Sequence, residues 1–198
     1  MIEKEKLEDL ALGLYQANCI YFGDFTLSGG DKSVIYFDLR MLRSNLPIKK
    51  FVIDLYAEMI MKVDNQFDLL SDVPNAATFL VSPLADKLQI PQISPRQKAK
   101  DHGRNNRIDG DFRPWDIVAL IEDTTTTGQS IINSGKILRE HNLVVNDVFA
   151  LIERPMGARE SLKDNEYNLH AVCTESNLLE LYLKHNLIPE EIKSKIMG

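Results

Sequence analysis

Two adjacent carboxylates, Glu122 and Asp123, stand directly before a run of hydroxyl side chains in this chain of 198 residues. Adjacent carboxylates can each accept hydrogen bonds from the hydroxyls of a vicinal diol. The residues from Thr124 to Ser130 add hydroxyls, a glycine and backbone N–H groups, and a new apolar period begins at Ile131. The start of a helix binds phosphate through unpaired N–H donors and the positive end of its dipole. The segment therefore predicts a polyol clamp beside a phosphate cradle.

The residues before the two acids explain how the clamp would be positioned. Val118 to Ile121 is a short apolar run typical of a buried parallel strand. Open α/β sheets place their ligands at the carboxyl ends of such strands, where Glu122 and Asp123 would emerge. We expect Thr124 to Ser130 to be the loop between this strand and a helix. A plain structural interpretation stays open, because strand-to-helix connections are often polar and a threonine before Gly-Gln-Ser can simply cap a helix.

A second informative segment runs from Arg96 to Asp111 and is almost entirely polar. It is longer than the usual connection between a strand and a helix, and long loops without structure are often functional. Its basic residues are Arg96, Lys98, Lys100, His102, Arg104 and Arg107. A solvated surface loop would explain the segment alone. Together with a phosphate cradle downstream, it favours a mobile lid that brings cations to a polyphosphate.

Composition excludes several classes of protein. The net charge of -6 argues against a nucleic-acid binder that works through bulk electrostatics. The apolar runs are far shorter than the roughly 20 residues that cross a bilayer. The first residues are charged and acidic, unlike a targeting peptide, so we expect a cytoplasmic protein with no membrane partner. Cys19 and Cys173 lie far apart in apolar contexts, and we expect both to be core residues.

The amino-terminal part predicts a helix followed by a small hairpin. Apolar residues between Leu7 and Leu14 are spaced as one face of a helix. Tyr21 to Asp38 has the pattern of two strands joined by a Gly-Gly turn at Ser28 to Lys32. We expect this part, about residues 1–40, to form a hood or flank. The apolar residues from Phe51 to Ile60 predict a second helix.

From Phe67 onward the pattern alternates between strands and helices. We expect strands at Phe67–Leu70, Gln92–Arg96, Ile117–Ile121, Asp147–Ile152 and Leu169–Thr174, a turn at Ser71–Ala76, helices at Ala77–Leu88 and Ile131–His141, and one or two closing helices in the tail. Such alternation is typical of an α/β fold with a central, mostly parallel sheet flanked by helices. We predict one domain over residues 1–198.

At these residues the chain resembles the type I phosphoribosyltransferases and, within them, the orotate phosphoribosyltransferases. Val118 to Ile131 has the form of the family's strand, acid pair, threonine-rich loop and helix. Three further segments point to the orotate enzymes: FGDFTLSGGDKSVIYFDLR is similar to their hairpin, RQKAKDHG to their catalytic loop, and ALIERPMGARESL to their strand and helix. The similar segments occur in the family's order and cover Phe22 to Leu183.

The resemblance implies a glycosyltransferase that moves ribose 5-phosphate from phosphoribosyl pyrophosphate (PRPP) to N1 of orotate, in pyrimidine biosynthesis. It implies the type I phosphoribosyltransferase fold with the hairpin as its hood. It also implies a homodimer in which the catalytic loop of one subunit reaches the site of its neighbour. Mg²⁺ would accompany the pyrophosphate. Because Mg²⁺ keeps water and binds substrate phosphates readily, we expect no dedicated metal ligands on the protein.

The resemblance also assigns the site residues. Lys100, His102 and Asp123 would be catalytic, with Lys100 and His102 stabilising the charge that develops on pyrophosphate. PRPP would be bound by Arg96, Lys100, His102, Glu122, Asp123, Thr124, Thr125, Thr126, Thr127, Gly128, Gln129 and Ser130. Orotate would be bound by Tyr36, Phe37, Thr126 and Arg154. A planar guanidinium suits bidentate recognition of the orotate carboxylate, although Arg154 alone could equally be a surface arginine after a strand.

The chain departs from the family at cationic positions. It has Ser28, Ala76 and Gln97 where many bacterial members carry lysine, and Asp72 stands in the pyrophosphate turn where a glycine is expected. Fewer cations should weaken PRPP binding. Two outcomes stay open at the turn from Asp72 to Ala77. If the backbone amides of residues 74–77 still cradle pyrophosphate, the enzyme can be active, and otherwise it is a divergent or weak enzyme.

Two alternatives to the orotate enzyme stay open. One is another type I phosphoribosyltransferase, for a purine or uracil, but such a base has less need of Arg154 or of the KAKDHG loop. The other is a non-catalytic PRPP-binding regulator on the same fold. A regulator of this kind would want a nucleic-acid surface, which this acidic chain does not suggest.

Overall fold

The computed structural model describes residues 2–27, 30–96 and 107–197 and divides the chain into two compact units. One unit combines Met1–Phe51 with Cys173–Gly198, and the other is Val52–Val172. The expected hood, about residues 1–40, falls in the first unit. Among the helices of the described residues, none has the length and apolar character needed to cross a membrane.

The first unit contains the expected amino-terminal helix and hairpin. Its elements are α1 (Lys4–Gln16), β1 (Ile20–Thr26), β2 (Lys32–Phe37), the 3-10 helix η1 (Leu39–Ser44), the start of α2 (Leu46–Met61), α6 (Glu175–Lys184) and α7 (Glu190–Met197). β1 and β2 pair antiparallel. Tyr182 of α6 is fully buried and packs against the rings of Tyr15 and Phe22. The two cysteines are buried, as the sequence predicts.

The second unit contains the alternating elements. They are the remainder of α2, β3 (Leu69–Asp72), α3 (Thr78–Leu88), β4 (Gln92–Pro95), β5 (Ile108–Asp109), β6 (Ile117–Thr125), α4 (Gln129–Arg139), β7 (Val144–Glu153), α5 (Ala158–Asp164) and most of β8 (Asn168–Thr174). The strand order is β5-β4-β3-β6-β7-β8. β3 pairs parallel with β4 and β6, and β6 pairs parallel with β7, whereas β4 and β5 are antiparallel. The predicted mostly parallel sheet is confirmed.

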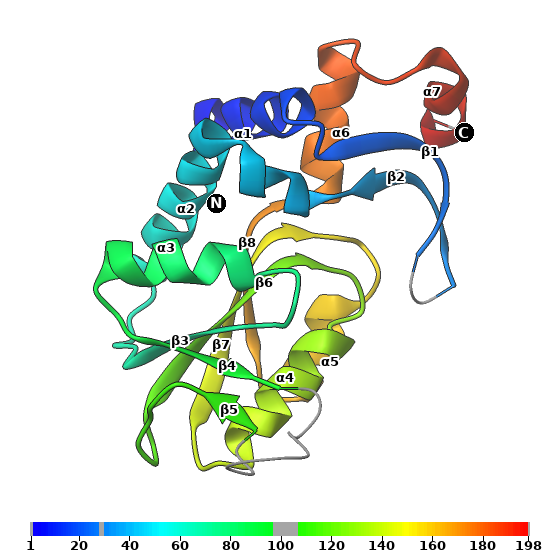
Figure 1. The fold of residues 1–198 in the computed structure, drawn as a ribbon. Coiled ribbons are helices and arrows are strands. Elements are labelled where there is room, and N and C mark those ends of the chain that lie inside the picture. Colours follow the sequence, from blue (N-terminus) through cyan, green and yellow to red (C-terminus); the bar gives the residue numbers. More distant parts are fainter. Residues whose placement is uncertain (1, 28–29, 97–106, 198) are drawn as a thin grey trace. The chain divides into compact units, whose positions relative to one another are not determined.

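The strand order creates a switch point between β3 and β6. The connection from β3 through α3 leads outward to β4, whereas the connection from β6 through α4 leads in the opposite direction to β7. Right-handed connections that diverge in this way leave α3 on one face of the sheet and α4 with α5 on the other (Figure 1). Ligands of doubly wound sheets bind at the carboxyl ends of the strands beside such a point. The ends of β3 and β6 therefore mark the crevice of interest.

The core beneath α4 and α5 holds the carboxyl half of β6 in place. Alternate residues of β6 and β7 point to this face, because successive side chains of a strand face opposite sides. Val118, Leu120, Val148 and Ala150 belong to one buried cluster with Ile131, Ile137 and Leu138 of α4 and with Ala158 and Leu162 of α5. At about 25 cal/mol per Å² of apolar surface, this burial is the main force that fixes α4 against the sheet.

Some elements begin at other residues than the sequence predicts: α2 begins at Leu46, β3 at Leu69 and β7 at Val144. Four further differences lie closer to the site. β6 continues through Thr125, so Thr124 and Thr125 are strand residues rather than loop. α4 begins at Gln129, two residues before the predicted start. Ser71 and Asp72 belong to β3, not to the turn. Two residues of the long polar segment, Ile108–Asp109, form β5 by pairing with β4.

Candidate active site

The two acids lie where the sequence places them, at the carboxyl end of β6. Glu122 lies opposite Ala150 of β7, and its side chain is only 5% exposed. Its Oε1 accepts a hydrogen bond from the backbone N–H of Asp123 at 3.0 Å, and Asp123 Oδ1 accepts one from Thr124 N–H at 2.6 Å. The buried hydroxyl of Tyr56, in α2, donates to the backbone carbonyl of Glu122 at 2.5 Å. These bonds fix the backbone on which both carboxylates are carried.

The surroundings of Glu122 disfavour the charged form of its carboxyl. Its burial, the neighbouring carboxyl of Asp123 and the charge of Asp72 together raise the pKa of Glu122 well above its ordinary value. A raised carboxyl pKa means that the protein around Glu122 disfavours the charged form. A diol, a cation or both would compensate for that charge. Strongly shifted acids in a crevice are typical of functional sites.

The threonine run changes from strand to helix within a few residues. Thr124 and Thr125 end β6, Thr126 to Gly128 form a bend, and α4 starts at Gln129. The hydroxyls of Thr124 and Thr125 are buried and have no hydrogen-bond partner within the described residues. Thr127, Gln129 and Ser130 are exposed. A buried hydroxyl without a partner is costly, so these two groups are available to a ligand oxygen or to bound water.

Gly128 makes the tight entry to α4 possible. It caps the helix with φ +78°, a left-handed conformation that favours glycine. A Cβ at this position would lie 2.9 Å from Leu162 Cγ, so the site also requires a close approach to α5. No side chain caps α4 among the described residues, which leaves its first N–H groups for an anion.

Arg154 lies near these residues, directly after β7, the strand that pairs with β6. It follows β7, and its backbone N–H donates to the carbonyl of Thr125 at 2.9 Å. Its side chain is only 5% exposed, so the alternative of a surface arginine is wrong. A buried arginine whose backbone is bonded to the threonine run can supply a guanidinium for a planar anionic group.

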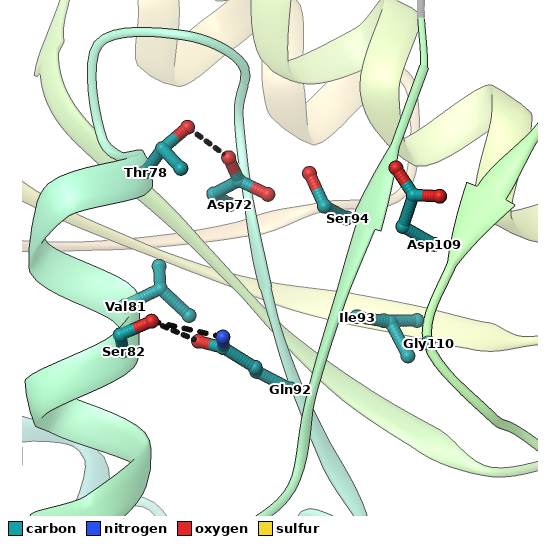
Figure 2. A pocket seen from close by; sticks show the side chains of 9 residues that line it. All are labelled: Asp72, Thr78, Val81, Ser82, Gln92, Ile93, Ser94, Asp109 and Gly110. Carbon is teal, nitrogen blue, oxygen red and sulfur yellow. Dashed lines mark hydrogen bonds between the residues drawn. The ribbon is translucent and has the colours of Figure 1, made fainter.

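The predicted pyrophosphate turn lies beside the acids, across the switch point. Asp72 lies opposite Ile121, and Val73 N–H donates to the carbonyl of Ile121 at 2.9 Å. Asp72 Oδ2 accepts a hydrogen bond from Thr78 Oγ1 (Figure 2). Pro74 has no N–H, so the expected cradle of backbone amides is reduced to residues 75–77.

A cavity of about 220 Å³ opens next to this turn, between α3 and the strands β4 and β5. Its lining is rich in hydroxyls, amides and carboxylates (Figure 2), and the polar residues are Asp72, Thr78, Ser82, Gln92, Ser94 and Asp109. Ser82 and Gln92 hydrogen-bond to each other across it. The Asp109 side chain is held by Arg96 in a two-pronged ion pair. Arg96 is therefore engaged by Asp109 and would have to exchange partners to reach a phosphate.

The remaining predicted residues are distributed as follows. Lys100, His102 and Gln97 lie outside the described residues, as does Ser28. Tyr36 and Phe37 lie in β2 of the first unit, where Tyr36 stacks at a tilt on Phe25 and its hydroxyl accepts from Arg40. Within the second unit the structure brings together Glu122 to Ser130 with Arg154.

Three residues help to position this site although the sequence did not indicate that role. They are Tyr56, Asp72 and Thr78. In the sequence, Tyr56 is one of the apolar residues that predict a helix. A tyrosine on a buried face also indicates a hydroxyl that needs a hydrogen-bond partner. The sequence suggested only that Asp72 adds a negative charge where a glycine is expected, and that Thr78 lies within a helix. The hydrogen bonds of all three span long loops or separate elements, which local patterns do not reveal.

The oxygen donors of the site fit a hard cation such as Mg²⁺, because carboxylate and hydroxyl oxygens are its preferred ligands. Over residues 2–27, 30–96 and 107–197, no group of three or more His, Cys, Asp or Glu side chains is arranged to hold a metal ion. Binding of Mg²⁺ mainly through substrate oxygens and water stays a prediction.

Comparison with known proteins gives a consistent result. No family model matches the chain. It is 32% identical over 190 residues to orotate phosphoribosyltransferase of Caenorhabditis elegans, covering 96% of this chain and 84% of that protein. It is 36% identical over 180 residues to orotate phosphoribosyltransferase of Methanocaldococcus jannaschii, covering 90% and 98%. The solved UMP synthase of Leishmania donovani superposes with a TM-score of 0.87 at 32% identity. The match covers 96% of this chain and 41% of that chain.

Proposed function

The chain belongs to the orotate phosphoribosyltransferase family, and from this premise we infer that it transfers ribose 5-phosphate from PRPP to N1 of orotate. The products are orotidine 5'-monophosphate and pyrophosphate, in the synthesis of UMP. The observation that carries the inference is the acid pair at the end of β6, with Glu122 buried, followed by unpartnered threonine hydroxyls and the open start of α4.

The reaction separates charge, and the site is built to hold both signs. Breaking the bond between C1 of the ribose and pyrophosphate builds positive charge on the sugar and negative charge on the leaving group. Glu122 and Asp123 would accept hydrogen bonds from the ribose 2- and 3-hydroxyls and stabilise the cationic sugar. Thr124 to Ser130 and the first N–H groups of α4 would hold the 5-phosphate. Arg96, Lys100 and His102 would face the pyrophosphate.

Recognition of the base rests on Arg154. Its guanidinium can bind the orotate carboxylate with two parallel hydrogen bonds, which a lysine cannot do. Thr126 and the hairpin residues Tyr36 and Phe37 would contact the ring. A uracil or purine offers no carboxylate, so it could not form this two-pronged contact with the guanidinium.

Cofactor, assembly and location are parts of the same proposal. Mg²⁺ would neutralise the pyrophosphate as its charge develops. The resemblance of RQKAKDHG to the family's catalytic loop supports a homodimer in which this loop serves the neighbouring site. A cytoplasmic location is expected for such an enzyme.

A panel of bases tests the function. The protein is incubated with PRPP, Mg²⁺ and orotate, uracil, hypoxanthine or adenine in turn, and nucleotide formation is followed for each. We expect turnover with orotate only. Turnover with a purine or with uracil would support the alternative transferase, and PRPP binding without turnover of any base would support the regulator.

A further inference from the structure

One hydrogen bond joins the two ends of the predicted pyrophosphate turn. Asp72 is the last residue of β3, and Thr78 is the first residue of α3. The Thr78 hydroxyl donates to Asp72 Oδ2, and both side chains border the cavity between α3 and β4 (Figure 2). Residues 73–77 are thereby closed into a loop whose two ends are tied by side chains.

The two ends of this turn are held differently. At its start, Val73 N–H donates to the carbonyl of Ile121, the residue before Glu122. The start of the turn is thus fastened to the strand that carries the acid pair. At its end, Ala77 caps α3 without a side-chain hydrogen bond among the described residues. The side-chain bond from Thr78 to Asp72 therefore ties the start of α3 to the end of β3, and it leaves the first backbone N–H groups of the helix to other partners.

Burial shows that the Asp72 carboxyl is an internal group. Asp72 is 2% exposed, and Val73 and Ala77 are 1% and 0% exposed. The residues between them, Pro74 to Ala76, reach solvent at least in part. The turn thus has a fixed, buried base and an accessible tip, which is the form expected of a preorganised anion-binding loop.

The charge of Asp72 needs an explanation at such a place. It lies close enough to Glu122 to help raise the pKa of that carboxyl, so its field reaches the acid pair. A negative charge also opposes an incoming pyrophosphate, and position 76 offers alanine rather than a cation. A carboxyl here is unfavourable for the ligand unless it does something else for the site.

We propose that the hydrogen bond between Asp72 and Thr78 is a positioning device, which holds residues 73–77 in the shape that receives the pyrophosphate group of PRPP. The inference rests on the proposed transferase function, because only that function assigns pyrophosphate to this turn. Asp72 acts through the backbone of the turn and touches no substrate. A turn already held in its binding shape loses less conformational freedom when the ligand arrives.

Four variants separate the bond from the charge. Thr78→Val removes the hydroxyl at an exposed position with little change in volume, and Thr78→Ser keeps the hydroxyl. Asp72→Ala removes the acceptor, and Asp72→Asn keeps an acceptor oxygen without the charge. Steady-state kinetics give KM for PRPP and kcat, and calorimetry gives the affinity for inorganic pyrophosphate with Mg²⁺. Melting temperatures confirm that each variant is folded.

A positioning role predicts a specific pattern. Thr78→Val and Asp72→Ala should each raise KM for PRPP about tenfold, with kcat nearly unchanged, because one hydrogen bond's worth of preorganisation is lost. Thr78→Ser should stay near wild type. Asp72→Asn keeps the acceptor oxygen and loses the opposing charge, so its KM for PRPP should be equal to or below that of the wild type. The double variant Asp72→Ala/Thr78→Val should be no worse than either single variant, because both remove the same bond.

Other patterns overturn the proposal. If Asp72→Ala tightens PRPP binding, the carboxyl is only a repulsive charge. If Asp72→Asn is as damaging as Asp72→Ala while Thr78→Val is normal, the charge itself matters, as for a metal ligand. Should Asp72→Ala misfold, the comparison of Thr78→Val with Thr78→Ser still decides the matter.

Pyrophosphate binding separates failure of this proposal from failure of the proposed function. A wild-type protein that binds pyrophosphate but makes no nucleotide from orotate contradicts the function, and a loss of affinity in Thr78→Val would still support the positioning role. A wild-type protein that turns over orotate, with KM for PRPP and affinity for pyrophosphate unchanged in Thr78→Val and Asp72→Ala, contradicts the positioning role alone. A wild-type protein that neither binds pyrophosphate nor turns over orotate contradicts both.

Discussion

At the scale of single residues, Glu122 shows most clearly how the site is prepared for a ligand. Burial and the carboxyls of Asp123 and Asp72 raise its pKa above the ordinary value of 4.5. The charged form is therefore unfavourable in the free protein and becomes favourable when a ligand compensates for it. Such groups lower the stability of a protein at the place where they serve its activity.

We predict that Glu122→Gln increases the free energy of unfolding at neutral pH while removing most transferase activity. The folded-state pKa of this acid lies above its unfolded value, so the folded wild type holds a proton that the unfolded chain releases. Its stability therefore falls as the pH rises from about 4.5 through the raised folded pKa. Glutamine does not ionise and avoids this loss, and its carbonyl can still accept the N–H of Asp123.

Urea unfolding of both proteins between about pH 5 and about pH 8 measures the effect. The advantage of Glu122→Gln should grow with pH, whereas the exposed Glu160→Gln, in α5, should follow the wild type throughout. An advantage that does not change with pH would show that Glu122 has no raised pKa in the folded protein.

The identities of the acids and threonines were predictable because they form one continuous motif. The burial of Arg154 and the bonds of Tyr56 and Thr78 were not. Arg154 is buried, and its backbone N–H bonds to Thr125, which lies in another strand. Tyr56 reaches Glu122 from a helix 66 positions earlier in the chain. Interactions of this kind depend on the packing of separate elements, which a single sequence does not specify.

At the scale of elements, the turn from β6 into α4 depends on Gly128. We predict that Gly128→Ala destabilises the second unit and weakens PRPP binding. The new methyl group would have to displace Leu162 and so shift the bend at residues 126–128, which we expect to bind phosphate. The left-handed conformation alone costs about 1 to 2 kcal/mol for alanine, and the steric clash adds about 1 to 3 kcal/mol.

Gly157→Ala is the matched control. Gly157 caps α5 with φ +82°, close to the φ of Gly128, but a Cβ there would meet nothing within 4 Å. Urea unfolding should show the smaller, purely conformational loss for Gly157→Ala. Equal losses for the two variants would mean that the contact with Leu162 relaxes freely.

The elements themselves were largely predictable, and the errors have local causes. β6 extends through Thr125 because β7 offers partners, with Thr124 opposite Ile152 and Thr125 opposite Glu153. Threonine is β-branched and accepts a strand when a neighbouring strand is available. β5 was missed because two residues carry no periodicity, and they form a strand only by pairing with Ser94 and Pro95.

At the scale of the whole molecule, the alternation of strands and helices predicted a parallel sheet, but not the order of its strands. That order brings the ends of β3 and β6 to the same switch point, and thereby brings the predicted pyrophosphate turn beside the acid pair. Residues separated by about 50 positions become neighbours in this way, which explains why the site could be only partly assembled from the sequence.

The proposed homodimer gives a prediction at this scale. Lys100→Ala and Asp123→Asn should each be nearly inactive, with Lys100→Ala reduced by about two orders of magnitude or more through loss of a charge-stabilising group. If the loop of one subunit serves its neighbour, mixed dimers contain one site with both native groups. Random exchange would then restore about a quarter of the wild-type activity.

The test is to mix the two inactive proteins under conditions that exchange subunits and to assay the mixture. Each variant taken through the same exchange alone is the control. No recovery, despite demonstrated exchange, would mean that each loop serves its own subunit.

The most direct test of the central claim is the stoichiometry of the reaction. The wild-type protein is supplied with orotate, PRPP and Mg²⁺, and orotidine 5'-monophosphate and pyrophosphate are quantified together. We predict equal amounts of the two products, formed in step with the loss of orotate. Release of pyrophosphate without the nucleotide, or no reaction of orotate in the presence of bound PRPP, would contradict the assignment.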